Sequence, residues 1–173
     1  MQLAGSTITA SILFADLRQY TALTEKLGAQ ETVAMLNEFF GYMTDVIFNC
    51  RGVLDKFMGD SIMAVFGAPI EGDRDADNAL DCAVGMMQAL NQLNVKREAR
   101  GHRPVHASIG ISTGGVVAGT IGSAKRMEYT VIGVSGSLAA GLERATEGHM
   151  RLDGEVWQDG ALVAKCLGTF ARI

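Results

Sequence analysis

The sequence has few cysteines, no long apolar run and no basic leader, and each absence excludes a class of protein. The three cysteines, Cys50, Cys82 and Cys166, are far apart and form no CxxC pair, so neither a zinc site nor a disulfide framework is indicated. We expect reduced, buried thiols instead. The sequence contains no uninterrupted run of about 18 apolar residues, so no membrane-spanning helix is predicted. The first residues show no basic segment followed by an apolar one, so no signal peptide is predicted and we expect a cytoplasmic domain without membrane contact.

The charge balance argues against a nucleic-acid partner. The net charge is −4 and the sequence pI is near 5.3, whereas binding to a phosphate backbone depends on clustered Lys and Arg. A nucleotide pocket stays open as an interpretation, because it needs only a few local cations or a metal. With 48% apolar and 20% charged residues, the 173-residue chain is long enough for one globular domain and too short for two.

The first half of the chain alternates between β-rich and helical patterns. Residues 8–15 are mostly apolar and predict a buried central strand that ends at Asp16. From Gln30 to Asn49 the apolar period changes to three and four residues, which indicates a long helix. The predicted apolar stripe of this helix is Val33, Leu36, Phe40, Met43 and Ile47.

A hairpin and a second helix follow. Two β-like runs, 53–58 and 61–66, are separated only by Gly59-Asp60, which is typical of a tight turn. The stripe of the next helix is predicted to be Ala76, Leu80, Ala83, Met87, Leu90 and Leu93, before a basic, solvated stretch from Lys96 to Arg103. Further strands are predicted over 105–117 and 127–132, with Gly119, Gly122 and Ser123 in the turn between them, and a short helix over 135–145. The order βαββαβ is the ferredoxin-like α/β (α+β) pattern.

Two carboxylates stand at positions where this topology can bring them together. Asp16 ends the first strand and Asp60 lies in the hairpin turn, and these strands can lie side by side in one sheet. Convergent carboxylates suit hard cations such as Mg²⁺, and a pair of metals about 3.5–4 Å apart can activate an attacking oxygen and stabilise a leaving one. Each residue alone also has a simpler interpretation, since Gly-Asp is ordinary turn chemistry and an Asp after a strand often caps a helix.

The residues around these carboxylates resemble the catalytic domains of the class III adenylyl and guanylyl cyclases. The segment 14–21 (FADLRQYT) is similar to the first metal-binding motif of that family, and 55–67 (DKFMGDSIMAVFG) is similar to the second. Shorter matches lie at 36–40, 109–114 and 129–133. The resemblance covers residues 8–145 in the right order, and the agreement of several motifs makes it specific.

The resemblance implies one nucleotidyl cyclase catalytic domain over residues 1–173, truncated at its C-terminus. It also implies a head-to-tail homodimer or heterodimer with active sites at the subunit interface. Asp16 and Asp60 of one chain, with the backbone carbonyl of Ala15, would hold two Mg²⁺ or Mn²⁺ ions on the triphosphate. The partner chain would present Lys56 and Thr130 to the purine, a pair typical of adenine readers. In such readers the Lys donates to a ring nitrogen and the Thr accepts from the amino group.

The remaining implied contacts concern the phosphates and the reaction. Backbone N–H groups that open the helix after Asp16 would cradle the phosphates of ATP. These groups belong to Leu17, Arg18, Gln19, Tyr20 and Thr21. The implied reaction is attack of the ribose 3′-hydroxyl on the α-phosphate, which yields cyclic AMP and pyrophosphate.

The chain departs from the family pattern where the remaining catalytic groups are expected. Ser137 and Gly141 occupy the usual positions of an Asn that orients the ribose and an Arg that stabilises charge on the phosphate. Ser108 stands where a phosphate-binding Arg is common. Loss of one preorganised donor typically costs about 10²–10³ in rate. Two hypotheses therefore stand: an adenylyl cyclase, weak alone, or a metal-donating or regulatory subunit with little activity of its own.

Two other classes with this topology fit less well. An RNA-binding module needs aromatic residues on the sheet face and basic charge, whereas aromatic residues are only 6% of this acidic chain. A diguanylate cyclase would carry a Gly-Gly-acidic-acidic-Phe signature, which is absent from the sequence.

Overall fold

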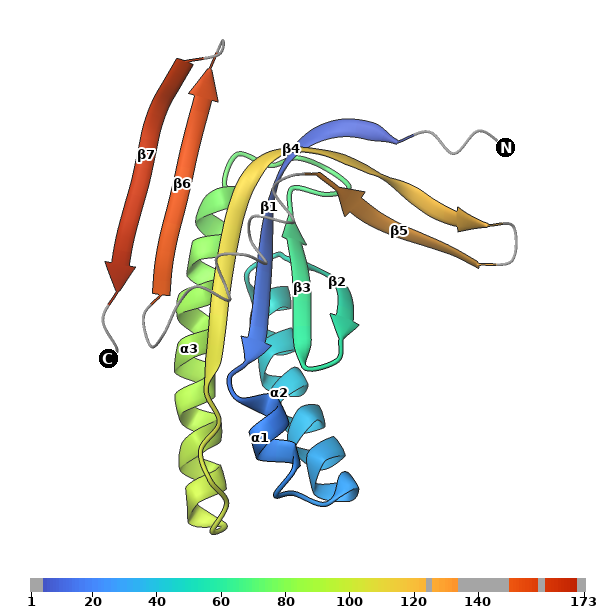
Figure 1. Cartoon of the computed structure of the whole chain (residues 1–173). Helices are drawn as coiled ribbons and strands as arrows, with labels where there is room; N and C mark the ends of the chain where they lie inside the picture. Colours follow the sequence, from blue (N-terminus) through green and yellow to red (C-terminus); the bar gives the residue numbers. More distant parts are fainter. Residues whose placement is uncertain (1–4, 124–125, 134–149, 159–160, 171–173) are drawn as a thin grey trace.

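A five-stranded antiparallel sheet forms the centre of the fold (Figure 1). The computed structural model describes residues 5–123, 126–133, 150–158 and 161–170, the last two ranges as backbone only. The elements are β1 (Ser6–Leu17), α1 (Tyr20–Thr24), α2 (Ala29–Asn49), β2 (Val53–Met58), β3 (Ser61–Phe66), α3 (Asp75–Ala99), β4 (Ala107–Ser123), β5 (Arg126–Ile132), β6 (Met150–Gln158) and β7 (Ala161–Phe170). This order confirms the predicted βαββαβ core. The helix predicted over 135–145 lies outside the described residues.

Strand β1 lies at the centre of the sheet, as its apolar sequence predicts. The strand order is β2-β3-β1-β4-β5, and β6 and β7 form a separate pair. Strand β1 pairs antiparallel with β3 over Ser11–Asp16 and with β4 along its full length. Because both edges are paired and successive side chains point to opposite faces, β1 contributes apolar residues to the cores on both faces.

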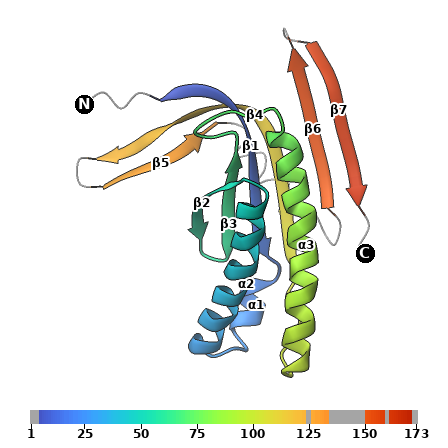
Figure 2. The ribbon, with the colours of Figure 1, turned by 180° about the vertical axis from the view of Figure 1, so that it is seen from behind.

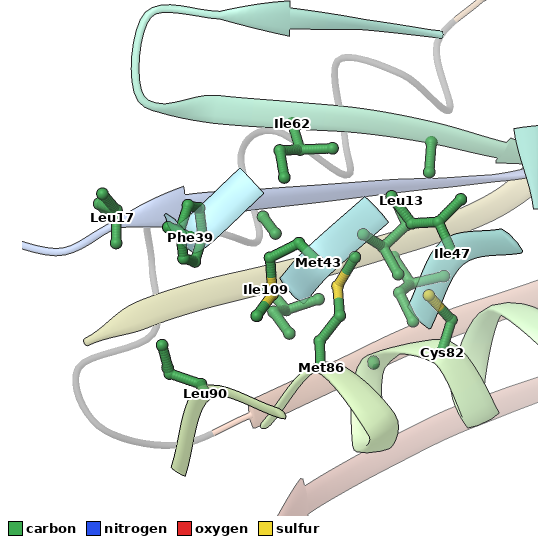
Figure 3. Packing of buried hydrophobic residues seen from close by; sticks show 14 of the residues in the cluster. Leu13, Leu17, Phe39, Met43, Ile47, Ile62, Cys82, Met86, Leu90 and Ile109 are labelled. Carbon is green, nitrogen blue, oxygen red and sulfur yellow. The ribbon is translucent and has the colours of Figure 1, made fainter. Parts of the chain in front are cut away.

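Helices α2 and α3 cover one face of the sheet (Figures 1 and 2). The core beneath them joins alternate residues of β1 to the inner faces of both helices (Figure 3). Its fully buried members include Leu13, Phe39, Met43, Ile47 and Met86. Burial of each such side chain contributes about 1.5–3 kcal/mol, so this layer holds the sheet and the helices together.

The helices are rotated relative to their predicted stripes. In α2 the buried positions are Met35, Phe39, Met43 and Ile47, whereas Val33 is 56% exposed. In α3, Cys82 and Met86 are buried and Leu80 is 37% exposed. Part of each predicted stripe is confirmed, because Met43 and Ile47 of α2 and Ala83, Leu90 and Leu93 of α3 are buried. Both helices carry apolar residues on two adjacent stripes, so periodicity alone does not separate them at the other positions. Packing against β1 selects the stripe that is buried.

The basic end of α3 also differs from its prediction. We expected Lys96 to Arg103 to be solvated, but α3 continues to Ala99 and Arg97 is only 4% exposed. Its guanidinium lies 3.6 Å from Glu38 Oε2 on α2 and donates to the Arg103 carbonyl at 3.1 Å. A carboxylate on the neighbouring helix makes the burial of this cation tolerable.

The face of the sheet opposite α2 and α3 holds a second, smaller core. It contains Ile12, Met63 and Val65 from β1 and β3, together with Val131 of β5. Strand β4 runs to Ser123, beyond its predicted end, so the glycines expected in the turn lie within the strand. Gly122 has φ +145° and faces the Arg126 carbonyl too closely for a Cβ. We call residues 117–123 and 126–132 the arm (Figure 1).

The two described thiols differ in burial, since Cys82 is buried as predicted and Cys50 is only partly buried. Cys50 and Cys82 are free, and burial raises the pKa of both thiols. The side chain of Cys166 lies outside the described residues. Within the part of the chain that the structure describes, no helix is long and apolar enough to cross a membrane.

The rotation of α2 makes a direct prediction. Phe39→Ala should lower the free energy of unfolding by about 3–5 kcal/mol, because it removes a fully buried ring and leaves a cavity. The control Val33→Ala, on the exposed face, should stay within about 0.5 kcal/mol. Urea denaturation of both variants measures the difference. Equal losses would place the buried stripe where the sequence put it.

Candidate functional site

Strand register brings the two predicted carboxylates together. Asp16 is the penultimate residue of β1 and pairs with Ser61, the first residue of β3. Asp60 precedes Ser61 in the hairpin turn. The Ser61 hydroxyl donates to Asp16 Oδ1 at 2.5 Å. Burial, followed by the charge of Asp16 and a hydrogen bond with its side chain, raises the pKa of Asp60.

This pair has the chemistry of a divalent-cation site that needs ligands from elsewhere. Two carboxylates at one point repel each other, and a divalent cation between them would relieve that repulsion. Among the described residues no group of three or more His, Cys, Asp or Glu side chains is placed so that it could hold a metal ion. The remaining ligands would therefore be water, phosphate or backbone oxygen. The carbonyl of Ala15, a fully buried residue of β1, stays a predicted ligand.

The predicted phosphate loop is only partly available for phosphate. Leu17 is buried as the last residue of β1, and the Arg18 N–H donates to the His106 carbonyl at 2.8 Å. The pairing with β4 thus already uses the Arg18 donor in this structure, and phosphate binding by the amides of residues 17–21 stays a prediction. Gln19 adopts a left-handed conformation with φ 55°, and α1 begins at Tyr20 and continues through Thr21.

The Arg18 side chain lies where the sequence indicated a missing cation. Its Nη1 donates to the Ser108 hydroxyl at 2.8 Å. Ser108 is the β4 partner of Asp16 in the strand register, so the Arg18 guanidinium contacts the residue opposite Asp16 even though Ser108 is not an Arg. Sequence reasoning missed this contact, since residues 18 and 108 meet only through the pairing of β1 with β4.

The structure also brings the two predicted purine-binding residues together, around a residue that was not predicted. Lys56 and Thr130 lie on β2 and β5, at opposite ends of the strand order. Thr130 Oγ1 nevertheless donates to Asp55 Oδ2 at 2.9 Å. Lys56 Nζ lies 3.3 Å from the same Asp55 oxygen and 3.2 Å from Glu128 Oε1. The end of β5 lies against the face of the sheet opposite α2 and α3, where Val131 packs with Met63 and Val65, and this brings Thr130 to Asp55 of β2.

These ion pairs keep Lys56 charged. Burial by itself lowers the pKa of this amine, but the contacts with Glu128 and Asp55 outweigh it and the net pKa is raised. The sequence does not predict Asp55 as a partner of Lys56, because adjacent strand residues normally point to opposite faces. It does not predict Glu128 either, because Glu128 lies on another strand. The predicted positions of the absent Asn and Arg, Ser137 and Gly141, lie outside the described residues.

Comparison with known proteins gives a family match over most of the chain. Residues 4–156 match the family model of the adenylate and guanylate cyclase catalytic domain. Adenylate cyclase 1 of Rhizobium meliloti is 32% identical over 89% of this chain and 23% of its own length. The adenylate cyclase of Anabaena cylindrica is 36% identical over 83% of this chain and 28% of its own. The chain thus spans about a quarter of these relatives.

Solved structures show the same fold. The guanylyl cyclase Cya2 superposes with a TM-score of 0.85, at 34% identity, covering 96% of this chain and 93% of that one. The adenylyl cyclase CyaB from P. aeruginosa has a TM-score of 0.83 and 32% identity, covering 87% of this chain and 79% of that one. Since one is named a guanylyl and the other an adenylyl cyclase, these likenesses leave the purine open.

The carboxylate pair predicts a ranking of metal affinities. Ser61→Ala removes the hydroxyl that orients Asp16 and should weaken Mn²⁺ binding about 10–100-fold, as loss of an outer partner of a ligand typically does. Asp16→Asn, which alters the ligand itself, should cost more. Electron paramagnetic resonance of free Mn²⁺ in titrations with ATP present measures both. Unchanged affinity in Ser61→Ala would show that Asp16 is not a ligand held by Ser61.

Proposed function

Since this chain belongs to the adenylate and guanylate cyclase catalytic domain family, we propose that it converts ATP into cyclic AMP and pyrophosphate at a dimer interface. The observation that carries the choice of ATP is the Lys56–Asp55–Thr130 cluster. A charged Lys56 donates to an adenine ring nitrogen, which in guanine carries a proton and repels a donor. Thr130, whose proton goes to Asp55, accepts from the adenine amino group.

The carboxylate pair and Arg18 serve the triphosphate. Asp16 and Asp60 would hold two Mg²⁺ or Mn²⁺ ions, which neutralise phosphate charge and activate the 3′-hydroxyl when bound. Ser61 fixes the rotamer of Asp16 through its 2.5 Å hydrogen bond. The Arg18 guanidinium, held at Ser108 opposite Asp16 in the strand register, adds a fixed positive charge for a phosphate oxygen.

A head-to-tail dimer supplies each site with both halves. In this proposal one chain gives the carboxylates and its partner gives Lys56 and Thr130. Exposed apolar side chains of the arm and of β2 support such an interface, because a monomer gains nothing from exposing them together. They are Val53, Phe57, Met58, Val117, Ile121, Met127, Tyr129 and Ile132, all at least 41% exposed.

The second candidate is a metal-donating or regulatory subunit. Ser137 and Gly141, at the expected positions of the ribose-orienting Asn and the charge-stabilising Arg, favour it. Such a chain would retain Asp16 and Asp60 and would gain activity only from a partner that brings the missing pair. The two candidates share the metal and purine chemistry and differ in whether this chain completes its own site.

Restoration of the two missing side chains separates the candidates. The native chain and a Ser137→Asn plus Gly141→Arg double variant are incubated with ATP and Mn²⁺, and cyclic AMP is followed by chromatography. The double variant should form cyclic AMP about 10²–10³-fold faster than the native chain, because loss of one such donor typically costs that much in rate. Its matched control adds Asp16→Asn and should be inactive.

Each outcome has a distinct meaning. If the double variant makes cyclic AMP and the native chain does not, the result supports a cyclase domain that lacks only those two side chains. Turnover by the native chain when mixed with an Asp16→Asn form of the double variant supports the metal-donating role. If the double variant makes cyclic GMP from GTP and no cyclic AMP from ATP, the adenine assignment is wrong.

The proposed interface predicts the effect of a charge on the arm. Met127→Glu should shift the chain toward monomer in sedimentation velocity and abolish cyclase activity in the double-variant background, because a carboxylate would be buried in an apolar contact. Val95→Glu places the same charge on an exposed position of α3 and should leave the oligomeric state unchanged. A Met127→Glu chain that remains dimeric would remove the arm from the interface.

A further inference from the structure

A bulge in β2 gives Asp55 its unusual position. The β2–β3 register pairs Leu54 with Ala64 and Lys56 with Met63, so Asp55 is the extra residue and has no partner across the ladder. A bulge changes the direction of a side chain. Here it lets Asp55 and Lys56, adjacent in sequence, meet at 3.3 Å with the Asp55 side chain only 5% exposed.

We propose that Asp55 is a positioning residue that sets the purine specificity of this site by holding the proton of the Thr130 hydroxyl. This inference rests on the proposed function, in which Thr130 contacts the base. A carboxylate can only accept a hydrogen bond, so the Thr130 proton must point to Asp55 at 2.9 Å. The outward side of Thr130 Oγ1 then presents only lone pairs.

That orientation distinguishes the two purines. Adenine carries an amino donor at C6, which an outward-facing acceptor binds, whereas guanine carries a carbonyl oxygen at C6, which it repels. Without Asp55 the hydroxyl could rotate and donate to the guanine carbonyl, because a hydroxyl is both donor and acceptor. Asp55 thus converts an ambiguous Thr into an adenine-selective one without touching the base.

The burial of Asp55 favours this orientation. With 5% of its side chain exposed, the carboxylate has little water to replace a lost hydrogen bond. Rotation of the Thr130 hydroxyl away from Asp55 would therefore cost a buried hydrogen bond, although the ion pair with Lys56 would remain. Glu128 differs in both respects. Its side chain is 44% exposed, and it is paired with Lys56, so it supports the charge of Lys56 rather than the direction of Thr130.

The experiment measures selectivity by equilibrium binding, which does not require turnover. ATP and GTP, each with Mn²⁺, compete with a fluorescent ATP analogue on the dimeric chain, and the readout is the ratio of the GTP and ATP dissociation constants. Asp55→Asn offers Thr130 an amide donor and frees the hydroxyl proton. The ratio should fall by about tenfold, within the range typical of one unmatched polar contact.

Two matched variants isolate the mechanism. Glu128→Gln also alters a partner of Lys56 and should change the ratio much less than Asp55→Asn. Thr130→Val removes the hydroxyl and should lower the ratio by itself. In that background Asp55→Asn should have no further effect, since a double-mutant cycle detects coupling between the two residues. The ratio is insensitive to the folded fraction, because both nucleotides compete on the same preparation.

The outcomes separate this inference from the proposed function. If the native chain prefers ATP and Asp55→Asn keeps that preference, Asp55 does not set specificity although the adenine assignment stands. The same conclusion follows if Asp55→Asn lowers the ratio equally with and without the Thr130 hydroxyl. If the native chain does not prefer ATP, both the adenine assignment and the role of Asp55 are wrong.

Discussion

The burial of β1 on both faces and at both edges is the constraint on which the rest of the structure depends. Its side chains fill a helix-covered core on one side and a smaller core on the other. A shift of one residue in register would exchange these two sets of side chains, so the pairing with β3 and β4 is strongly specified. The position of Asp16 opposite Ser61 and Ser108 follows from that register. The packing of the core therefore fixes the register that positions the site residues.

The same strand pairing also brings two carboxylates close together, which is unfavourable without a ligand. Asp16 and Asp60 lie together at the end of the sheet, where burial and mutual repulsion raise the pKa of Asp60. Isolated carboxylates would move apart, but strand register and the β2–β3 turn keep them in place. Groups held in this way are typical of functional sites, because the ligand supplies the missing stabilisation. A divalent cation bound to a triphosphate fits that need.

The second half of the site depends on curvature rather than on strand order. Strands β2 and β5 are at opposite ends of the sheet, yet the end of β5 lies against the face opposite α2 and α3, where Val131 packs among Met63 and Val65. This packing carries Thr130 to the buried carboxylate of Asp55. Apolar packing on one face and a polar cluster beside it thus depend on the same curl, and the bulge in β2 completes the cluster.

The sequence by itself determined the order of the elements, the central place of β1 and the meeting of Asp16 with Asp60. These features follow from local periodicity, a two-residue turn and the antiparallel neighbours that the βαββαβ order imposes. Tertiary structure alone decided that α2 buries Met35 and Phe39, that Arg97 is internal and that Arg18 stands at Ser108. It also decided that Asp55 joins Lys56 to Thr130. Helix rotation, ion-pair partners and bulges depend on contacts between segments far apart in the chain. Local sequence patterns do not predict such contacts, because they reflect only neighbouring residues.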